Sequence, residues 1–232
     1  MAVVLGIDAA TADAAVALAR DGRVLSEVAV PPGPEGRPQH SRILLSEVER
    51  AVEAGGGWAK VDRIAVGIGP GSYTGLRIGI ATARALAQSR DLPIAGVGSL
   101  AALARGISEH PDATEVALPI LDARRGQVFA ALYERDGSET WPPLVVEPAE
   151  LAQRLREVDS PLLAAGDGAV RFAAELEAAG VAVAMPDDPV NRIAARHVCA
   201  LGETAAGEAP ERIEPIYLRE PDAKRWQQRD RK

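Results

Sequence analysis

Short apolar segments separated by turn residues organise the first forty residues. Residues 3–8, 14–19 and 23–30 are rich in Val, Ile, Leu and Ala, and the Asp21–Gly22 pair separates the last two. Apolar segments of this length between turn signals predict three strands joined by tight turns. Four prolines within residues 31–38 predict a loop, because proline neither continues a ladder nor sits inside a helix.

Helical spacing follows the loop. Apolar residues recur every three or four positions from Ser41 to about Ala54, with charged residues between them, which predicts a helix. Strands are predicted at 63–68 and 92–97, on either side of a second helix at 76–88. This order of three strands, helix, strand, helix, strand resembles the ribonuclease-H-like unit of the actin, Hsp70 and sugar-kinase (ASKHA) superfamily.

The second half repeats the opening pattern. A strand ending in Asp122, a second strand and the pair Asp136–Gly137 follow in the same order as Asp8, the second strand and Asp21–Gly22. Such a repeat predicts an α/β protein of two ribonuclease-H-like lobes, at 1–108 and 109–232, the second smaller and degenerate. The remaining predicted elements of this half are strands at 116–122 and 127–133, helices near 148–158, 170–179 and 191–206, a strand-like segment at 213–218 and a charged tail.

Composition excludes several classes of protein. The chain is 47% hydrophobic and 25% charged, with a formal net charge of −7, so we expect no unaided wrapping of nucleic acid. One cysteine excludes an intrachain disulfide framework and a cysteine-based zinc site. No apolar run approaches the roughly 20 residues of a membrane span, and no signal peptide is expected. These features predict a cytoplasmic protein that does not enter a membrane.

The glycine-rich run Gly67–Gly79 is the strongest local motif. A strand, a glycine turn and a helix can aim backbone N–H groups at an anion, and Arg77 is the cation within reach. The run lacks the lysine of a P-loop and does not match the dinucleotide fingerprint. A tight turn that caps the next helix, with Ser72 or Thr74 as N-cap, is the simpler interpretation. Both remain open from the sequence.

Small residues follow one face of the second predicted helix. A stripe of small residues lets another helix, from this chain or from a partner, approach closely, or it lies against the sheet of its own lobe. Three larger apolar residues, Leu76, Ile80 and Leu86, offer a separate face for the sheet, so two packing faces favour a partner on the small face. The small residues, spaced four apart, are Gly75, Gly79, Ala83 and Ala87.

Aspartates end the first strand of each lobe. Asp8 and Thr11 correspond to the first phosphate hairpin of actin-like ATPases, and Asp122 to the second. The bulky Arg124 and Arg125 next to Asp122 can contact phosphate or fill the cleft, so classical ATP hydrolysis is disfavoured. A two-metal nuclease is rejected because the end of the fourth predicted strand carries no carboxylate.

The histidines give no indication of a metal or catalytic site. His40, His110 and His197 lack the i, i+4 spacing with which two histidines on a helix chelate a metal. We therefore expect no catalytic residue, no metal and no cofactor, with Asp8, Thr11 and Arg77 as weak candidates for cofactor contact.

Five motifs follow one another along nearly the whole chain: GIDAAT, HSRILLSEVE, GIGPGSYTGLRIGIATARALA, PILDARRGQVFAALY and PIYLREPDA. Together they resemble the TsaB (YeaZ) family of bacterial tRNA threonylcarbamoyladenosine biosynthesis proteins. The resemblance implies a degenerate paralogue of the catalytic subunit TsaD and a scaffold role beside it, with a TsaE-like ATPase as a further partner.

The resemblance also implies where partners bind. In this family the first two helices pair with those of TsaD, or with a second TsaB in a homodimer, and tRNA is met through the complex only. Residues 217–232 carry six Lys or Arg and three Asp or Glu, which predicts a solvated tail with little tRNA affinity. The alternative class is an enzyme, either an ASKHA-type small-molecule kinase or ATPase, or a glycoprotease-like peptidase. The interface expected on the two helices comprises Leu44, Val48, Gly75, Gly79, Ala83 and Ala87.

Overall fold

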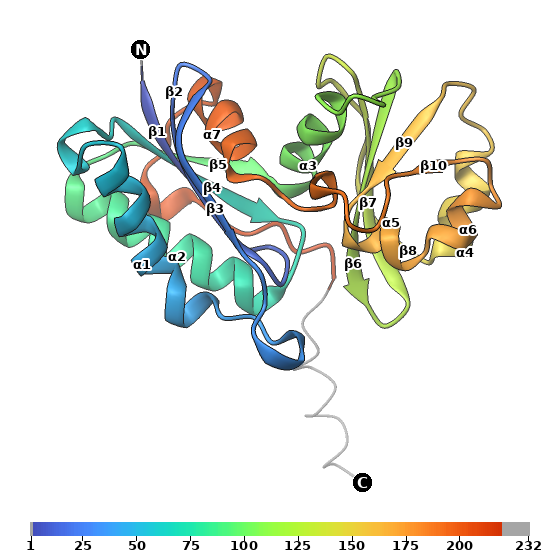
Figure 1. Ribbon diagram of the computed structural model, residues 1–232, viewed down its shortest axis with the longest axis horizontal. Coiled ribbons are helices and arrows are strands. Elements are labelled where there is room, and N and C mark those ends of the chain that lie inside the picture. The colour runs from blue at the N-terminus through green and yellow to red at the C-terminus, as the bar shows by residue number, and fades with distance from the viewer. Residues whose placement is uncertain (1, 220–232) are drawn as a thin grey trace, which may run out of the picture.

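Two five-stranded sheets with the same topology form the body of the protein (Figure 1). The computed structural model describes residues 2–219, so the charged tail predicted beyond residue 219 lies outside the described residues. The strand orders are β3-β2-β1-β4-β5 and β8-β7-β6-β9-β10. In each order the first three strands pair antiparallel with one another, and the last two run parallel to the central strand, β1 or β6. The predicted repeat of two ribonuclease-H-like lobes is confirmed. The strands are β1 Val3–Asp8, β2 Ala14–Arg20, β3 Arg23–Val30, β4 Arg63–Gly69, β5 Ile94–Gly98, β6 Val116–Arg124, β7 Gln127–Glu134, β8 Glu139–Val146, β9 Leu162–Ala165 and β10 Ala182–Val183.

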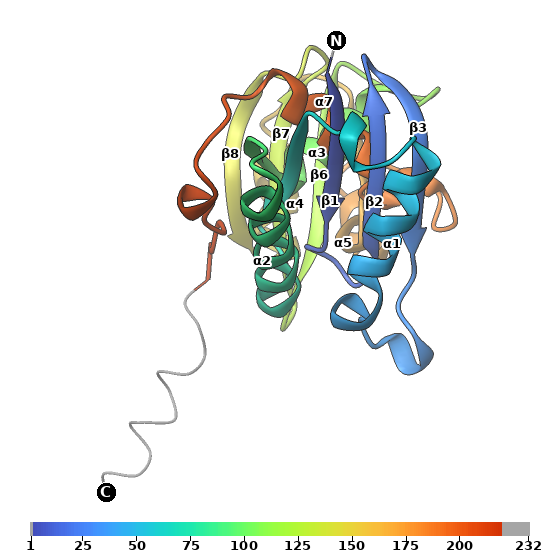
Figure 2. The same cartoon turned by 90° about the vertical axis from the view of Figure 1, so that its left-hand side faces the viewer.

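Helices cover both faces of each sheet. On the first sheet α1 (His40–Ala54) and α2 (Tyr73–Arg90) lie side by side on one face (Figure 2), and α7 (Ala195–Thr204) covers the other. Strands β1 and β2 are therefore buried on both faces, which explains why their sequences are continuously apolar instead of alternating. The second sheet packs on α3 (Ser99–Ser108) and, on its other face, on α4 (Pro148–Leu155), α5 (Asp167–Arg171) and α6 (Ala173–Glu177).

The lobes exchange their last helices. Helix α3, from the first half of the chain, packs on β6, whereas α7, from the second half, packs on β1, β2 and β4. A Cβ at Gly6 on β1 would approach Ala195 O and Cys199 Sγ to 2.7 Å, so this glycine permits the close contact of α7. In the sequence, the strands of the first sheet precede residue 108 and those of the second sheet follow it. One apolar core nevertheless includes residues from both lobes.

Several predicted elements differ from the structure. The segment predicted as a strand at 213–218 belongs to neither sheet, so that prediction is wrong. The helix predicted at 170–179 is divided into α5 and α6 at Phe172, whose φ of −115° and ψ of 29° are not helical. Helix α7 begins at Ala195 instead of 191. Helix α3 and strands β8, β9 and β10 were not predicted, and single 3-10 turns occur at Pro34–Gly36, Trp58–Lys60, Pro189–Asn191 and Pro210–Arg212.

No helix within residues 2–219 is both long enough and apolar enough to cross a membrane.

Candidate functional site

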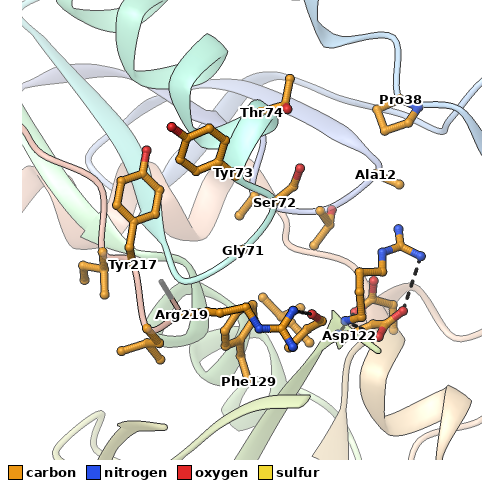
Figure 3. Close-up of a pocket in the computed structure, with 18 of the residues that line it drawn as sticks. Ala12, Pro38, Gly71, Ser72, Tyr73, Thr74, Asp122, Phe129, Tyr217 and Arg219 are labelled. Atoms are coloured by element: carbon orange, nitrogen blue, oxygen red, sulfur yellow. Dashed lines mark hydrogen bonds and ion pairs between the residues drawn. The ribbon is translucent and has the colours of Figure 1, made fainter. Parts of the chain in front are cut away.

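A cavity of about 480 Å³ lies between the two lobes (Figure 3). Its walls come from the loop after β1, the start of α2, the end of β6 and the C-terminal residues 216–219. Three aromatic side chains, Tyr73, Phe129 and Tyr217, line it. Ligands of α/β proteins bind beyond the carboxyl ends of parallel strands, so this cavity is the candidate ligand-binding site.

The carboxylate of Asp8 is directed into the protein and does not line the cavity. Its Oδ1 accepts a hydrogen bond from Ala10 N at 2.8 Å, and its Oδ2 accepts one from Ser99 Oγ at 2.7 Å. A Cβ at Gly67 would overlap this carboxylate, so the first glycine of the glycine-rich run makes room for it. Burial raises the pKa of Asp8 above its ordinary value. Asp8 thus joins the end of β1 to the start of α3.

The other two candidates for cofactor contact do not lie with Asp8. Thr11 lines the cavity, and its Oγ1 accepts a hydrogen bond from Asp13 N at 3.3 Å. Arg77 lies outside the cavity, where its Nε donates to Tyr217 Oη at 3.2 Å and its guanidinium lies 4.2 Å from the centre of the Tyr73 ring. The structure does not bring the three residues into one site.

Asp122 is held by arginines from two elements. Its Oδ2 lies 2.7 Å from Arg171 Nη1 and 3.4 Å from Arg124 Nη1, and the side chain is 7% exposed. Asp167 Oδ1 accepts a hydrogen bond from Asp122 N at 2.9 Å, and burial raises the pKa of Asp167. These contacts satisfy the carboxylate that the sequence placed at the second phosphate position.

Sequence reasoning missed Asp167 and Arg171. One signal was available, because Gly166-Asp167-Gly168 follows β9 as the glycine-rich run follows β4. The pairing itself depends on the packing of α5 against β6, which no local pattern shows.

Arg219 lies across the cavity wall (Figure 3). Its Nη1 donates to Ala123 O at 3.0 Å, and its Nη2 donates to Gln127 Oε1. From the sequence, Arg124 could either contact phosphate or fill the cleft; in the structure its side chain lines the cavity and is 69% exposed. A residue from the end of the described chain therefore contacts the β6–β7 hairpin from inside the cleft.

The turn of the glycine-rich run caps α2. Ser72 Oγ accepts a hydrogen bond from Gly75 N at 3.3 Å, which makes Ser72 the N-cap. Of the two residues suggested by the sequence, Ser72 and Thr74, the structure selects the first.

The three histidines do not share a contact partner. His40 Nε2 lies 3.1 Å from Asp13 O, His110 Nε2 lies 3.0 Å from Asp188 Oδ2, and His197 is buried on α7. Among the described residues no group of three or more His, Cys, Asp or Glu side chains could hold a metal ion.

The six residues expected at a partner interface are buried within the chain, which corrects their assignment. Ala83 is 0% exposed, and a Cβ added at Gly79 would lie only 3.3 Å from the Cβ of Ala9. The small side chains allow α2 to approach the β1–β2 loop and α1, so they serve packing inside the lobe. The buried set is Leu44, Val48, Gly75, Gly79, Ala83 and Ala87.

The opposite side of the same helices is accessible. Leu45 on α1 is 52% exposed, an unusual value for a large apolar side chain. On α2, Ala81 and Ala85 are exposed, and Ile78 is partly exposed. We call these four residues the outer helix face.

Comparison with known proteins gives consistent matches. The family described as TsaD, tRNA N6-adenosine threonylcarbamoyltransferase, matches residues 34–209. The chain is 32% identical over 224 residues to the tRNA threonylcarbamoyladenosine biosynthesis protein TsaB of Escherichia coli (strain K12), covering 93% of this chain and 94% of that protein. It superimposes on YeaZ from Pseudomonas aeruginosa with a TM-score of 0.75 and 25% identity, covering 94% of this chain and 100% of that one.

A more distant structure shares the fold alone. The ROK hexokinase from Thermus thermophilus gives a TM-score of 0.51 at 15% identity, covering 87% of this chain and 98% of that one. The two chains therefore share a two-lobed fold.

Proposed function

The chain belongs to the TsaB (YeaZ) family of tRNA threonylcarbamoyladenosine biosynthesis proteins, and on this premise we propose that it is a non-catalytic subunit supporting a TsaD-like catalytic subunit. In this proposal the partner forms threonylcarbamoyladenosine next to the anticodon of ANN-decoding tRNAs in the cytoplasm. The present chain supplies a folded surface that the partner requires.

The contacts of Asp8 and Asp122 support the proposal that the chain is non-catalytic. Asp8 accepts hydrogen bonds from Ser99 Oγ and Ala10 N, and Asp122 is paired with Arg171 and the neighbouring arginine. A carboxylate that takes part in phosphate chemistry must be accessible from the ligand cavity. Here their oxygens already have protein partners, so the residues serve to connect elements of the fold.

The outer helix face supports the partner assignment. It comprises an exposed leucine, Leu45 on α1, and small or aliphatic residues on α2. Two helices with small outward residues can pack against two helices of another subunit in a four-helix arrangement. The same face could serve a homodimer, so both assemblies would compete for it.

The remaining partners are a TsaE-like ATPase and tRNA. With a formal net charge of −7, the chain is poorly suited to bind tRNA alone, so contact with tRNA is proposed through the assembled complex.

A reconstitution from purified components tests the proposal. Formation of modified tRNA by TsaD-like and TsaE-like proteins should require this chain. Asp8→Asn and Asp122→Asn should both sustain it, because in this proposal neither carboxylate takes part in the reaction, and the amide oxygen of Asn still accepts a hydrogen bond at each position. Loss of activity in either variant, with normal binding of the partner, would show that the chain contributes to the chemistry.

A further inference from the structure

The segment at residues 213–219 is joined to both lobes. Ile213 is 2% exposed and belongs to the core of the first lobe. Ile216 N donates to Ile68 O on β4 at 2.7 Å, although the segment joins no sheet. Pro215 provides no backbone donor, which is one reason why a regular ladder does not form here. The segment therefore leaves the first lobe as an extended connection.

Tyr217 fixes the middle of the segment to α2. Its ring centroid lies 5.2 Å from that of Tyr73, with an interplanar angle of 32°. Its hydroxyl accepts a hydrogen bond from Arg77 Nε, while the guanidinium of Arg77 stacks on Tyr73. Aromatic pairs and cation–π stacks of this kind restrict side-chain freedom in both partners. The first lobe thus holds Tyr217 through two residues of one helix.

Arg219 reaches the second lobe. Its guanidinium contacts Ala123 O and the Gln127 side chain, at the two ends of the β6–β7 turn. In that turn Arg124, Arg125 and Gly126 all have positive φ values, of 63°, 56° and 77°. A guanidinium that donates in two directions to the ends of one turn makes a specific attachment.

The position of these contacts determines what they restrain. Helices α3 and α7 contact each other between the sheets and join the lobes on one side (Figure 1). The cavity opens on the other side, and residues 216–219 form part of its wall (Figure 3). An attachment there opposes rotation of the lobes about the α3–α7 contact.

We propose that residues 213–219 act as a clasp that limits opening of the two lobes, with Tyr217 seated on α2 and Arg219 on the β6–β7 turn. The clasp keeps the cleft between the lobes in one arrangement. It makes the chain a rigid body whose two lobes present a constant surface.

Pulsed electron paramagnetic resonance, which measures the distance between two spin labels, tests the clasp in the full chain. Glu53→Cys on α1 and Glu175→Cys on α6 place spin labels on exposed positions of the two lobes. The native Cys199 is buried and burial raises its thiol pKa to about 12, so it stays unlabelled. Combining Tyr217→Ala with Arg219→Ala should broaden the distance distribution and shift it, whereas Arg212→Ala, at an exposed arginine earlier in the same stretch, should leave it unchanged.

Two further variants make the result decisive. Arg219→Lys keeps a donor for Ala123 O, so its distance distribution should be narrower than that of the Tyr217→Ala, Arg219→Ala chain. Far-UV circular dichroism should show native secondary structure in every variant. An unchanged distribution in the folded Tyr217→Ala, Arg219→Ala chain would overturn the proposal. If that variant does not fold, Arg219→Gln alone provides the same test, because the Arg219 side chain is only partly buried and lines the cavity instead of the core.

Discussion

Two alanines on α2, two positions apart, separate internal packing from partner binding. Ala83 is 0% exposed against the body of its own lobe, whereas Ala85 belongs to the exposed outer helix face. Replacing each by glutamate introduces the same side chain on the same helix. We expect Ala83→Glu to lose stability, and Ala85→Glu to keep its stability but lose the TsaD-like partner.

The expected magnitudes follow from burial. At Ala83 the added atoms overpack a filled site, at about 1–3 kcal/mol, and a desolvated carboxylate adds at least about 3 kcal/mol. A loss of about 4 kcal/mol lowers the melting temperature of a chain of this size by roughly 10 °C. At Ala85 the exposed substitution should change stability by less than about 0.5 kcal/mol.

The effect of Ala85→Glu on binding is calculated in the same way. In a closed interface the carboxylate would lose its hydration without a designed partner, which costs about 3 kcal/mol. That corresponds to at least about a hundredfold increase in Kd, because each 1.4 kcal/mol is a factor of ten.

Thermal melting of each variant alone, together with size-exclusion and calorimetric titration against the partner, measures both effects. Ala85→Gln serves as the matched control for size without charge. A normal melting temperature for Ala83→Glu would refute the burial argument. Unchanged partner affinity in Ala85→Glu would show that the outer helix face is not the interface.

Three further outcomes are expected. Burial lowers the pKa of His197 from 6.5 to about 4, so its contribution to stability is complete above pH 6.5 and should fall by about 3 kcal/mol as pH drops toward 4; urea midpoints at pH 7.5 and 4.5 should therefore differ less in His197→Leu than in the native chain. The thiol of Cys199 should react with a disulfide reagent only as fast as the protein unfolds, and an immediate stoichiometric reaction would contradict its burial. Arg63 Nη1 donates to three carbonyls at the end of α7, at 2.7, 3.0 and 2.8 Å; Arg63→Ala should cost about 2 kcal/mol in chemical denaturation, with partial recovery in Arg63→Lys.

The sequence predicts most of the sheet elements, because apolar runs and turn pairs are local signals. Strand β8 was missed since Pro142 and Pro143 argue against a strand, and the structure resolves this by placing it at the sheet edge, where proline is tolerated. The two short strands β9 and β10 contain too few residues to show a period.

The candidate site was harder to predict than the fold. Helical periodicity correctly groups Gly79 and Ala83 on one face, but it does not say which face is directed at the sheet. The contacts of Asp8 with Ser99 and of Asp122 with Arg171 join residues far apart in sequence, so they follow only from the packed lobes.

The exchange of the last helices has a consequence for how the chain is made. As residues 1–108 leave the ribosome, the face of the first sheet that carries Gly6 has no cover, because α7 begins almost ninety residues further along the chain and emerges later. At about 5–20 residues per second, that interval lasts roughly 5–20 s. During it, the nascent chain presents a broad aliphatic surface that a ribosome-associated chaperone can bind. The first half is therefore expected to remain a client of such factors until the second half is translated, and the two halves to become native together.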